Sequence, residues 1–233
     1  MSLATVVAAV FEKYADRPAM GSRVKRLVIG QSGERVVHLE PRYQTQTYAQ
    51  LWARTGYVAS SLHHNAQAPV HAGDTVAMLS FTNADYATLD IACIRIGAMT
   101  VPLQTGTSLA DLLAVLDETR PVLLACSVEQ LDTAVACITA TPSIRRLVVL
   151  DVAEGASDQV SAIEQAQVRL RDSGSEVEVS TFHNDVENGK ALPDVELDVR
   201  PNCDDELAML IYTSGSTRLP KGAMYTQKLA AGM

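Results

Sequence analysis

The residues from 209 to 226, MLIYTSGSTRLPKGAMYT, carry the side chains of this sequence that are best suited to chemistry. An apolar run leads into a loop that is rich in hydroxyl side chains and glycine and also contains lysine. Hydroxyl and main-chain N–H groups donate hydrogen bonds to phosphate oxygens, glycine lets the backbone approach closely, and lysine supplies positive charge. The stretch therefore predicts a polyphosphate-binding loop. Its candidate binding residues are Thr213, Ser214, Gly215, Ser216, Thr217, Lys221 and Gly222.

The order of residues in this loop excludes the common P-loop pattern. That pattern, G-x-x-x-x-G-K-[ST], needs a lysine directly after its second glycine, whereas Lys221 precedes Gly222 in this sequence. An ordinary surface turn rich in serine, threonine and glycine would have the same composition. Composition by itself therefore leaves both interpretations open.

The elements before the loop alternate between helix and strand. TYAQLWARTGYVASSLHH repeats apolar residues at helical spacing, and Thr47 is suited to begin that helix. HAGDTVAMLSF predicts a strand, and NADYATLDIACIRIGAMTV predicts a helix up to Gly97 followed by a second strand. The alternation continues through SLADLLAVLDETRP, VLLAC, SVEQLDTAVACITATP and IRRLVVLDV. Short apolar strands separated by helices favour an α/β fold with a mostly parallel sheet.

Two regions depart from this alternation. Residues 22–41 alternate apolar and polar side chains around the pair Ser32-Gly33, which predicts an antiparallel hairpin added at the surface. Residues 153–201 are polar and acidic, with one helix expected near residues 158–172. The later part of this second region is expected to be a connection that leads to the phosphate-binding loop.

The composition argues against several classes of protein. The 233 residues are 47% apolar, which is enough for a sizeable core, and a net charge of -8 leaves no basic face for nucleic acid. The N-terminus lacks the features of a secretion signal, and no apolar run reaches the roughly 20 residues of a membrane span. The four cysteines lack metal-site spacing and are expected to be buried free thiols of a cytoplasmic protein. They are Cys93, Cys126, Cys137 and Cys203.

Other polar residues that could do chemistry have simpler interpretations. His63 and His64 end a predicted helix, where their partial charge is favourable, so a metal site is not predicted there. Asp85 and Asp90 are five residues apart on a predicted helix and point in different directions, which argues against paired-carboxylate catalysis. Tyr212 is interpreted as the end of a buried strand. No catalytic residue and no metal ligand are therefore assigned within the chain.

Three motifs in order give this sequence a family resemblance. YTSGST followed by PKGAM resembles the phosphate-binding signature of the AMP-forming adenylation superfamily, which includes acyl-CoA synthetases, luciferases and adenylation domains of peptide synthetases. QTYAQLWARTGYVAS and IRIGAMTVPLQT resemble two upstream segments of that superfamily. FTNADYATLD and the ending PLQT are similar, more narrowly, to the adenylation domain of bacterial carboxylic acid reductases, including the mycobacterial reductase sometimes labelled a fatty-acyl-CoA ligase.

The resemblance implies a fold and a reaction. Residues 1–233 would be an incomplete N-terminal portion of the adenylate-forming fold, with a variable connection at 152–200 and the phosphate-binding motif at 209–226. The parent enzyme would use ATP and Mg²⁺ to convert a carboxylic (fatty) acid into an acyl-adenylate. It would pass the acyl group to a phosphopantetheine thiol and reduce the thioester to an aldehyde with NADPH. The Mg²⁺ ligand, the remaining adenylation residues, and the carrier and reductase regions would lie downstream, so this chain alone is expected to be inactive.

This interpretation has two alternatives, and the sequence departs from the family pattern at one position. The chain could instead belong to an acyl-CoA synthetase, with CoA as the acceptor, or it could be an inactive remnant or a nucleotide-binding module without turnover. The departure is Arg218, which stands where the family normally has glycine. A bulky side chain at a position that needs a positive φ is strained, so we expect impaired phosphate binding. The opposite interpretation is that the Arg218 guanidinium adds a phosphate contact.

Overall fold

The computed structural model describes residues 2–31, 33–200, 203–213 and 220–232. Its helices are α1 (Leu3–Lys13), α2 (Tyr48–His63), α3 (Ala84–Ile96), α4 (Leu109–Thr119), α5 (Leu131–Ala140), α6 (Ser157–Asp172), α7 (Phe182–Gly189) and α8 (Gln227–Ala231). Its strands are β1 (Pro18–Ile29), β2 (Arg35–Thr47), β3 (Thr75–Leu79), β4 (Met99–Leu103), β5 (Leu123–Ser127), β6 (Arg146–Leu150), β7 (Glu178–Thr181), β8 (Leu207–Thr213) and β9 (Lys221–Thr226). Within the described residues, no helix is both long enough and apolar enough to cross a membrane.

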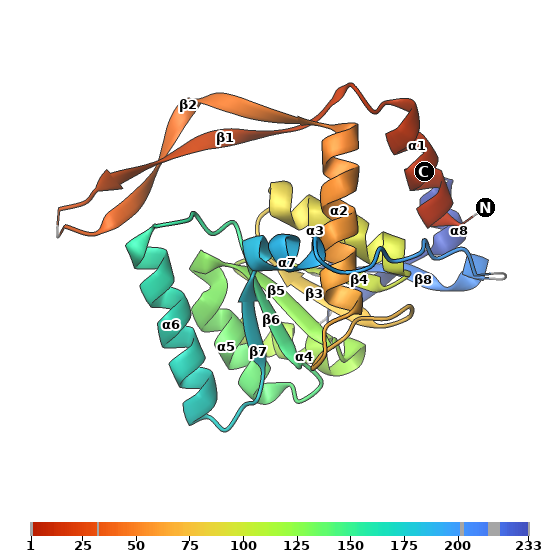
Figure 1. The fold of residues 1–233 in the computed structure, drawn as a ribbon. Helices are drawn as coiled ribbons and strands as arrows, with labels where there is room; N and C mark the ends of the chain where they lie inside the picture. Colours follow the sequence, from red (N-terminus) through yellow and green to blue (C-terminus); the bar gives the residue numbers. More distant parts are fainter. Residues whose placement is uncertain (1, 32, 201–202, 214–219, 233) are drawn as a thin grey trace.

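A seven-stranded sheet forms the centre of the molecule (Figure 1). Its strand order is β7-β6-β5-β3-β4-β8-β9, and every neighbouring pair is parallel except β8 and β9. The central strands β3, β5 and β6 are buried along their whole length, which explains why their sequences are apolar almost throughout. The predicted α/β fold with a mostly parallel sheet is confirmed.

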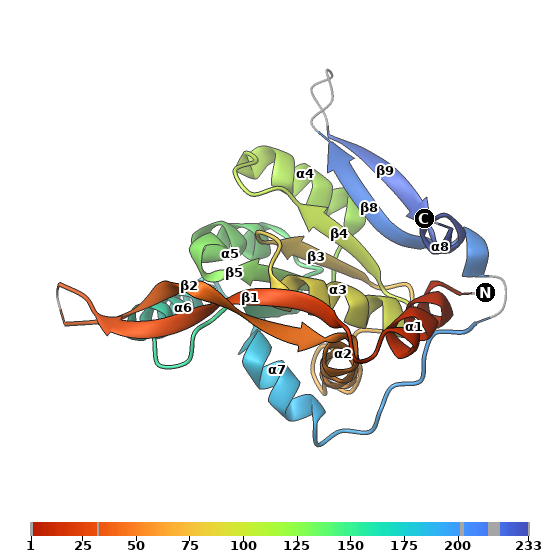
Figure 2. The same ribbon diagram turned by 90° about the horizontal axis from the view of Figure 1, so that it is seen from above.

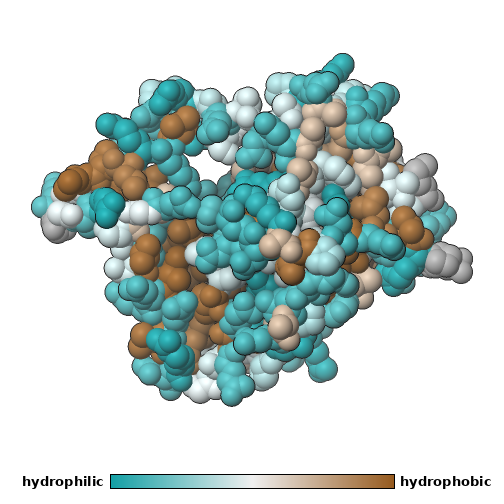
Figure 3. All heavy atoms as spheres, viewed as in Figure 1, coloured by the Kyte–Doolittle hydropathy of each residue, from teal (hydrophilic) through white to brown (hydrophobic). Residues whose placement is uncertain are grey.

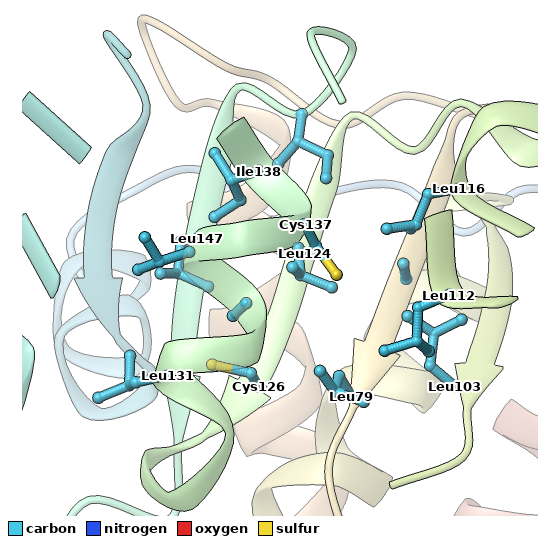
Figure 4. Packing of buried hydrophobic residues seen from close by; sticks show 14 of the residues in the cluster. Leu79, Leu103, Leu112, Leu116, Leu124, Cys126, Leu131, Cys137, Ile138 and Leu147 are labelled. Carbon is cyan, nitrogen blue, oxygen red and sulfur yellow. The ribbon is translucent and has the colours of Figure 1, made fainter. Parts of the chain in front are cut away.

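Helices cover both faces of this sheet. On one face, α4, α5 and α6 pack against a core cluster that includes Leu116, Leu124, Ile138 and Leu147, and Figure 4 shows how these side chains meet. On the other face, α2, α3 and α7 enclose a second cluster around Met78. The result is a three-layer arrangement of helices, sheet and helices, which buries both faces of each central strand.

Local signals set the ends of two helices on the second face. The Thr47 side chain accepts a hydrogen bond from the Gln50 N–H, and the Gln50 side chain accepts one from the Thr47 N–H, so α2 begins with a capping box. Gly97 ends α3 with a φ of 80°, a left-handed conformation that favours glycine. Both helix boundaries agree with the sequence prediction.

The predicted hairpin is present and is longer than its sequence pattern suggested. β1 and β2 form an antiparallel two-stranded sheet that extends away from the N-terminal end of α2 (Figures 1 and 2). It is attached to the central domain where Lys25 Nζ lies 2.7 Å from Asp151 Oδ1 and where the Arg35 N–H donates to Ser157 Oγ. Apolar side chains gather near its outer end in Figure 3, and Ile29 there is 77% exposed.

The prediction that the later part of residues 153–201 is only a connection is wrong. The helix expected near 158–172 is α6, but the later part contains strand β7 and helix α7 as well as connecting chain. β7 pairs with β6 along the edge of the sheet, and Phe182 of α7 is buried in the second core cluster. The sequence pattern did not predict β7 and α7, because an edge strand and a surface helix each bury only a few apolar side chains.

Candidate functional site

Most of the predicted phosphate-binding motif, residues 209–226, falls in the two strands β8 and β9 at one end of the sheet. β8 and β9 are antiparallel neighbours, and Thr213 at the end of β8 is the cross-strand partner of Lys221 at the start of β9. Figure 2 shows these strands side by side. Lys221 and Gly222 were expected within the loop, and the structure places them in β9 instead. The other candidates, Ser214, Gly215, Ser216 and Thr217, lie outside the described residues, as does Arg218.

The direction of the strands locates this motif at the carboxyl edge of the sheet. β8 is parallel to β4, and β4 is parallel to β3, so the residues that follow these strands lie at the same edge. Thr213 ends β8 at this edge, where Gln104 follows β4 and Ser80 follows β3. Ligands of open α/β sheets bind outside the carboxyl ends of the strands. The fold therefore brings the motif to the edge where a ligand site is expected.

Lys221 supplies a positive charge at this edge. Lys221 is exposed and forms no ion pair with any of the described residues. Its ammonium group is therefore not neutralised by a carboxylate among them. The next element described after β8 is a strand and not a helix. Phosphate binding at this edge would therefore depend on hydroxyls, N–H groups and Lys221, without a helix dipole directly after the loop.

Tyr212 and Gly222 form a close contact that sequence reasoning missed. They are cross-strand partners, and a Cβ atom added to Gly222 would lie 3.1 Å from Cζ of the Tyr212 ring. The ring packs against the core cluster beneath α4. Burial, together with the neighbouring Glu118 carboxylate, raises the pKa of Tyr212 to about 12. The sequence placed Tyr212 at a strand end, but the register that pairs it with a glycine depends on β9.

The remaining polar candidates have structural partners. The rings of His63, His64 and His71 are neighbours, with centroid distances of 5.0 and 5.1 Å, but the described residues contain no group of three side chains arranged to hold a metal ion. Asp85 pairs with Arg54 at 2.7 Å, whereas burial raises the pKa of Asp90, which lies near Thr100. Asp85 and Asp90 therefore lie in different surroundings.

Comparison with known proteins extends these observations. The family model described as "AMP-binding enzyme" matches residues 11–231. The chain is 42% identical over 233 residues to a carboxylic acid reductase of Segniliparus rugosus, covering 99% of this chain and 20% of that protein. It is 42% identical over 228 residues to a carboxylic acid reductase of Mycobacterium tuberculosis, covering 97% of this chain and 19% of that protein. The chain therefore spans about a fifth of the length of these curated relatives.

A solved structure matches the same chain closely. It is the A domain of carboxylic acid reductase from Segniliparus rugosus in complex with AMP and a co-purified carboxylic acid. The match has a TM-score of 0.93 at 41% identity, and it covers 98% of this chain and 36% of that one. The central sheet, its helical layers and the β8–β9 pair thus belong to a fold that holds AMP in that relative.

Proposed function

This chain belongs to the AMP-binding enzyme family, and we propose from that membership that it forms part of an adenylation domain that activates a carboxylic acid. In this reaction a carboxylate oxygen attacks the α-phosphorus of ATP, an acyl-adenylate forms, and pyrophosphate leaves. The observation that carries the proposal is the match to the Segniliparus rugosus A domain, which binds AMP and a carboxylic acid. Those two ligands are the parts from which an acyl-adenylate is made.

The proposed phosphate contacts are the seven residues of the sequence motif. Thr213 and Lys221 stand opposite each other at the carboxyl edge, where a hydroxyl donor and a positive charge fit a polyphosphate. Ser214, Gly215, Ser216, Thr217 and Gly222 complete the proposed set. Their role is to hold the phosphates so that the α-phosphorus faces the carboxylate, because alignment is a large part of catalysis.

Magnesium is the expected companion of ATP, and the described residues present no cluster of side chains that marks a site for it. No group of three His, Cys, Asp or Glu side chains is arranged among them to hold a metal ion. We therefore propose that the Mg²⁺ ligands belong to another part of the enzyme. The four free, buried cysteines suit a reducing compartment, which supports a cytoplasmic enzyme.

For the whole protein we propose a carboxylic acid reductase. Its adenylation domain would pass the acyl group to a phosphopantetheine thiol on a carrier region, and a reductase region would form the aldehyde with NADPH. The 42% identity to two reductases across nearly the entire chain supports this acceptor over CoA. The carboxylic acid itself is expected to be a small molecule, with a fatty acid as the first candidate.

Carboxylate-dependent ATP–pyrophosphate exchange by the full-length protein tests the proposal. We expect exchange with one or more carboxylic acids, and aldehyde formation when NADPH is added without CoA. Formation of an acyl-CoA in place of an aldehyde would identify an acyl-CoA synthetase. ATP binding without exchange across a panel of aliphatic and aromatic acids would instead indicate a nucleotide-binding module without turnover.

A further inference from the structure

The backbone conformation at Gly222 does not require a glycine. Gly222 lies within β9, and its φ is not among the positive glycine angles of the described chain. Other residues could adopt this extended conformation without strain. What distinguishes the position is space, because the nearest neighbours of an added Cβ would be the Tyr212 ring atoms at 3.1, 3.3 and 3.5 Å.

The Tyr212 ring links this glycine to the first core cluster. Tyr212 and Leu210 project from β8 towards the cluster that contains Leu112 and Leu116 of α4. The Tyr212 hydroxyl is buried, and the Glu118 carboxylate at the end of α4 is its charged neighbour. Lys221 is next to Gly222 but is exposed, so β9 must be held in place by contacts other than those of the lysine side chain.

We propose that Tyr212 is a positioning residue for Lys221 and that Gly222 is glycine to accommodate the Tyr212 ring. The ring occupies the space over Gly222 and holds the first residues of β9 against β8. This contact sets the place of the Lys221 main chain, and through it the place from which the ammonium group reaches a phosphate. The inference rests on the proposed adenylation function, and it revises one of the seven proposed phosphate contacts: Gly222 serves by packing against Tyr212 and not by touching a phosphate.

The first test compares tyrosine variants in the full-length enzyme. Tyr212→Ala should raise the KM for ATP about tenfold in pyrophosphate exchange while changing the KM for the carboxylic acid less than twofold. Tyr212→Phe keeps the ring over Gly222 and should stay within about twofold of wild type. Tyr225→Phe is the matched control, since Tyr225 pairs with Met209 in the same two strands but alternates to the other face. A Tyr212→Ala variant with an unchanged KM for ATP would overturn the positioning role.

The second test is a double-mutant cycle between Tyr212 and Gly222. Gly222→Ala alone should raise the KM for ATP several-fold, because its Cβ displaces the ring. In the Tyr212→Ala background the same change should have little further effect, since the space is then open. Equal effects in both backgrounds would mean that Gly222 serves the phosphates directly and would overturn the packing role.

Two controls separate this inference from the proposed function. A wild-type enzyme without any exchange would overturn the adenylation function itself. If the wild type is active but the effects of Tyr212→Ala and Gly222→Ala on the KM for ATP simply add, only the Tyr212–Gly222 contact would be overturned. The same cycle measured by urea denaturation needs no activity. If the changes in unfolding midpoint caused by the two substitutions do not add, the Tyr212–Gly222 contact is supported; changes that add would contradict it.

Discussion

Arg146 of β6 and Asp185 of α7 form an ion pair that is almost completely buried, with each side chain 1% exposed. The Asp185 carboxylate also accepts hydrogen bonds from the hydroxyls of Ser61 and Ser180. This cluster joins α2, β6, β7 and α7, so it connects the edge of the sheet to the helical layer above it. The polar segment around β7 and α7 is thereby fixed to the core by a charge pair as well as by apolar contacts.

Removing one partner of this pair should destabilise the fold strongly. Asp185→Asn leaves the buried Arg146 charge uncompensated, so we expect a loss of about 3–5 kcal/mol in the free energy of unfolding by urea denaturation. Asp132→Asn is the control, because it breaks the exposed pair with Arg169 and should cost less than about 1 kcal/mol. A double change to Arg146→Met and Asp185→Leu should recover much of the loss. Similar costs for Asp185→Asn and Asp132→Asn would contradict the structural role of the pair.

Gly97→Ala should destabilise the protein through two separate effects. The φ of 80° is unfavourable for alanine by roughly 1–2 kcal/mol, and the new Cβ would lie 2.2 Å from Asp198 Oδ2. Gly174→Ala isolates the first effect, since Gly174 has a φ of 76° and open space around its Cβ position. Gly97→Ala should therefore lower the unfolding midpoint more than Gly174→Ala does. Equal midpoints would mean that Asp198 moves aside freely.

Alkaline pH should weaken the fold through its buried thiols. Burial raises the pKa of Cys93 and Cys126 well above the ordinary value, and it raises that of Cys137 to about 11. Unfolded thiols ionise at about pH 8.5, so the folded state loses stability as the pH rises above that value towards the folded pKa. Below about pH 8 this stability is fully present.

Urea denaturation between pH 7 and 10 measures this effect. Cys93→Ala should reduce the fall in unfolding free energy by about 1.4 kcal/mol per pH unit above pH 9, because one ionising thiol is removed. Thr88→Ala changes a buried side chain of the same helix that does not ionise, so it should lower stability without altering the slope. A slope that stays the same in Cys93→Ala would show that other groups cause the alkaline loss.

Lys221→Ala should weaken ATP binding in the full-length enzyme. A hydrogen bond to a charged group contributes about 1.5–3 kcal/mol, so the KM for ATP in pyrophosphate exchange should rise by about tenfold or more. Lys228→Ala removes an exposed lysine of α8 and should leave the KM unchanged. If both variants have the same KM as wild type, Lys221 does not contact the phosphates.

Arg218→Gly tests whether the unusual arginine impairs the loop. If Arg218 displaces the phosphates by about 1 Å, restoring glycine should raise the exchange rate by up to about a hundredfold, because in-line alignment is recovered. Arg218→Lys retains the charge and should remain close to the original rate. An exchange rate that falls in Arg218→Gly would identify the guanidinium as a phosphate contact.

The sequence by itself determined the features that depend on neighbouring residues. Helical periodicity and the capping side chain of Thr47 defined the start of α2, the left-handed preference of glycine ended α3 at Gly97, and alternation around Ser32-Gly33 indicated the hairpin. The order of hydroxyls, glycines and lysine also predicted the phosphate-binding motif. Each of these signals acts within a few residues, so it can be read without knowing the rest of the fold.

Only the tertiary structure decided which distant residues meet. The strand order placed β8 beside β4, the register of β9 put Gly222 under the Tyr212 ring, and β7 with α7 brought Asp185 to Arg146. No local pattern encodes these contacts, because a glycine, a tyrosine or a buried charge has the same sequence signature whatever its partner. Pairing across the sheet selects the partner, since a shift of one residue would turn every side chain of a strand to the opposite face.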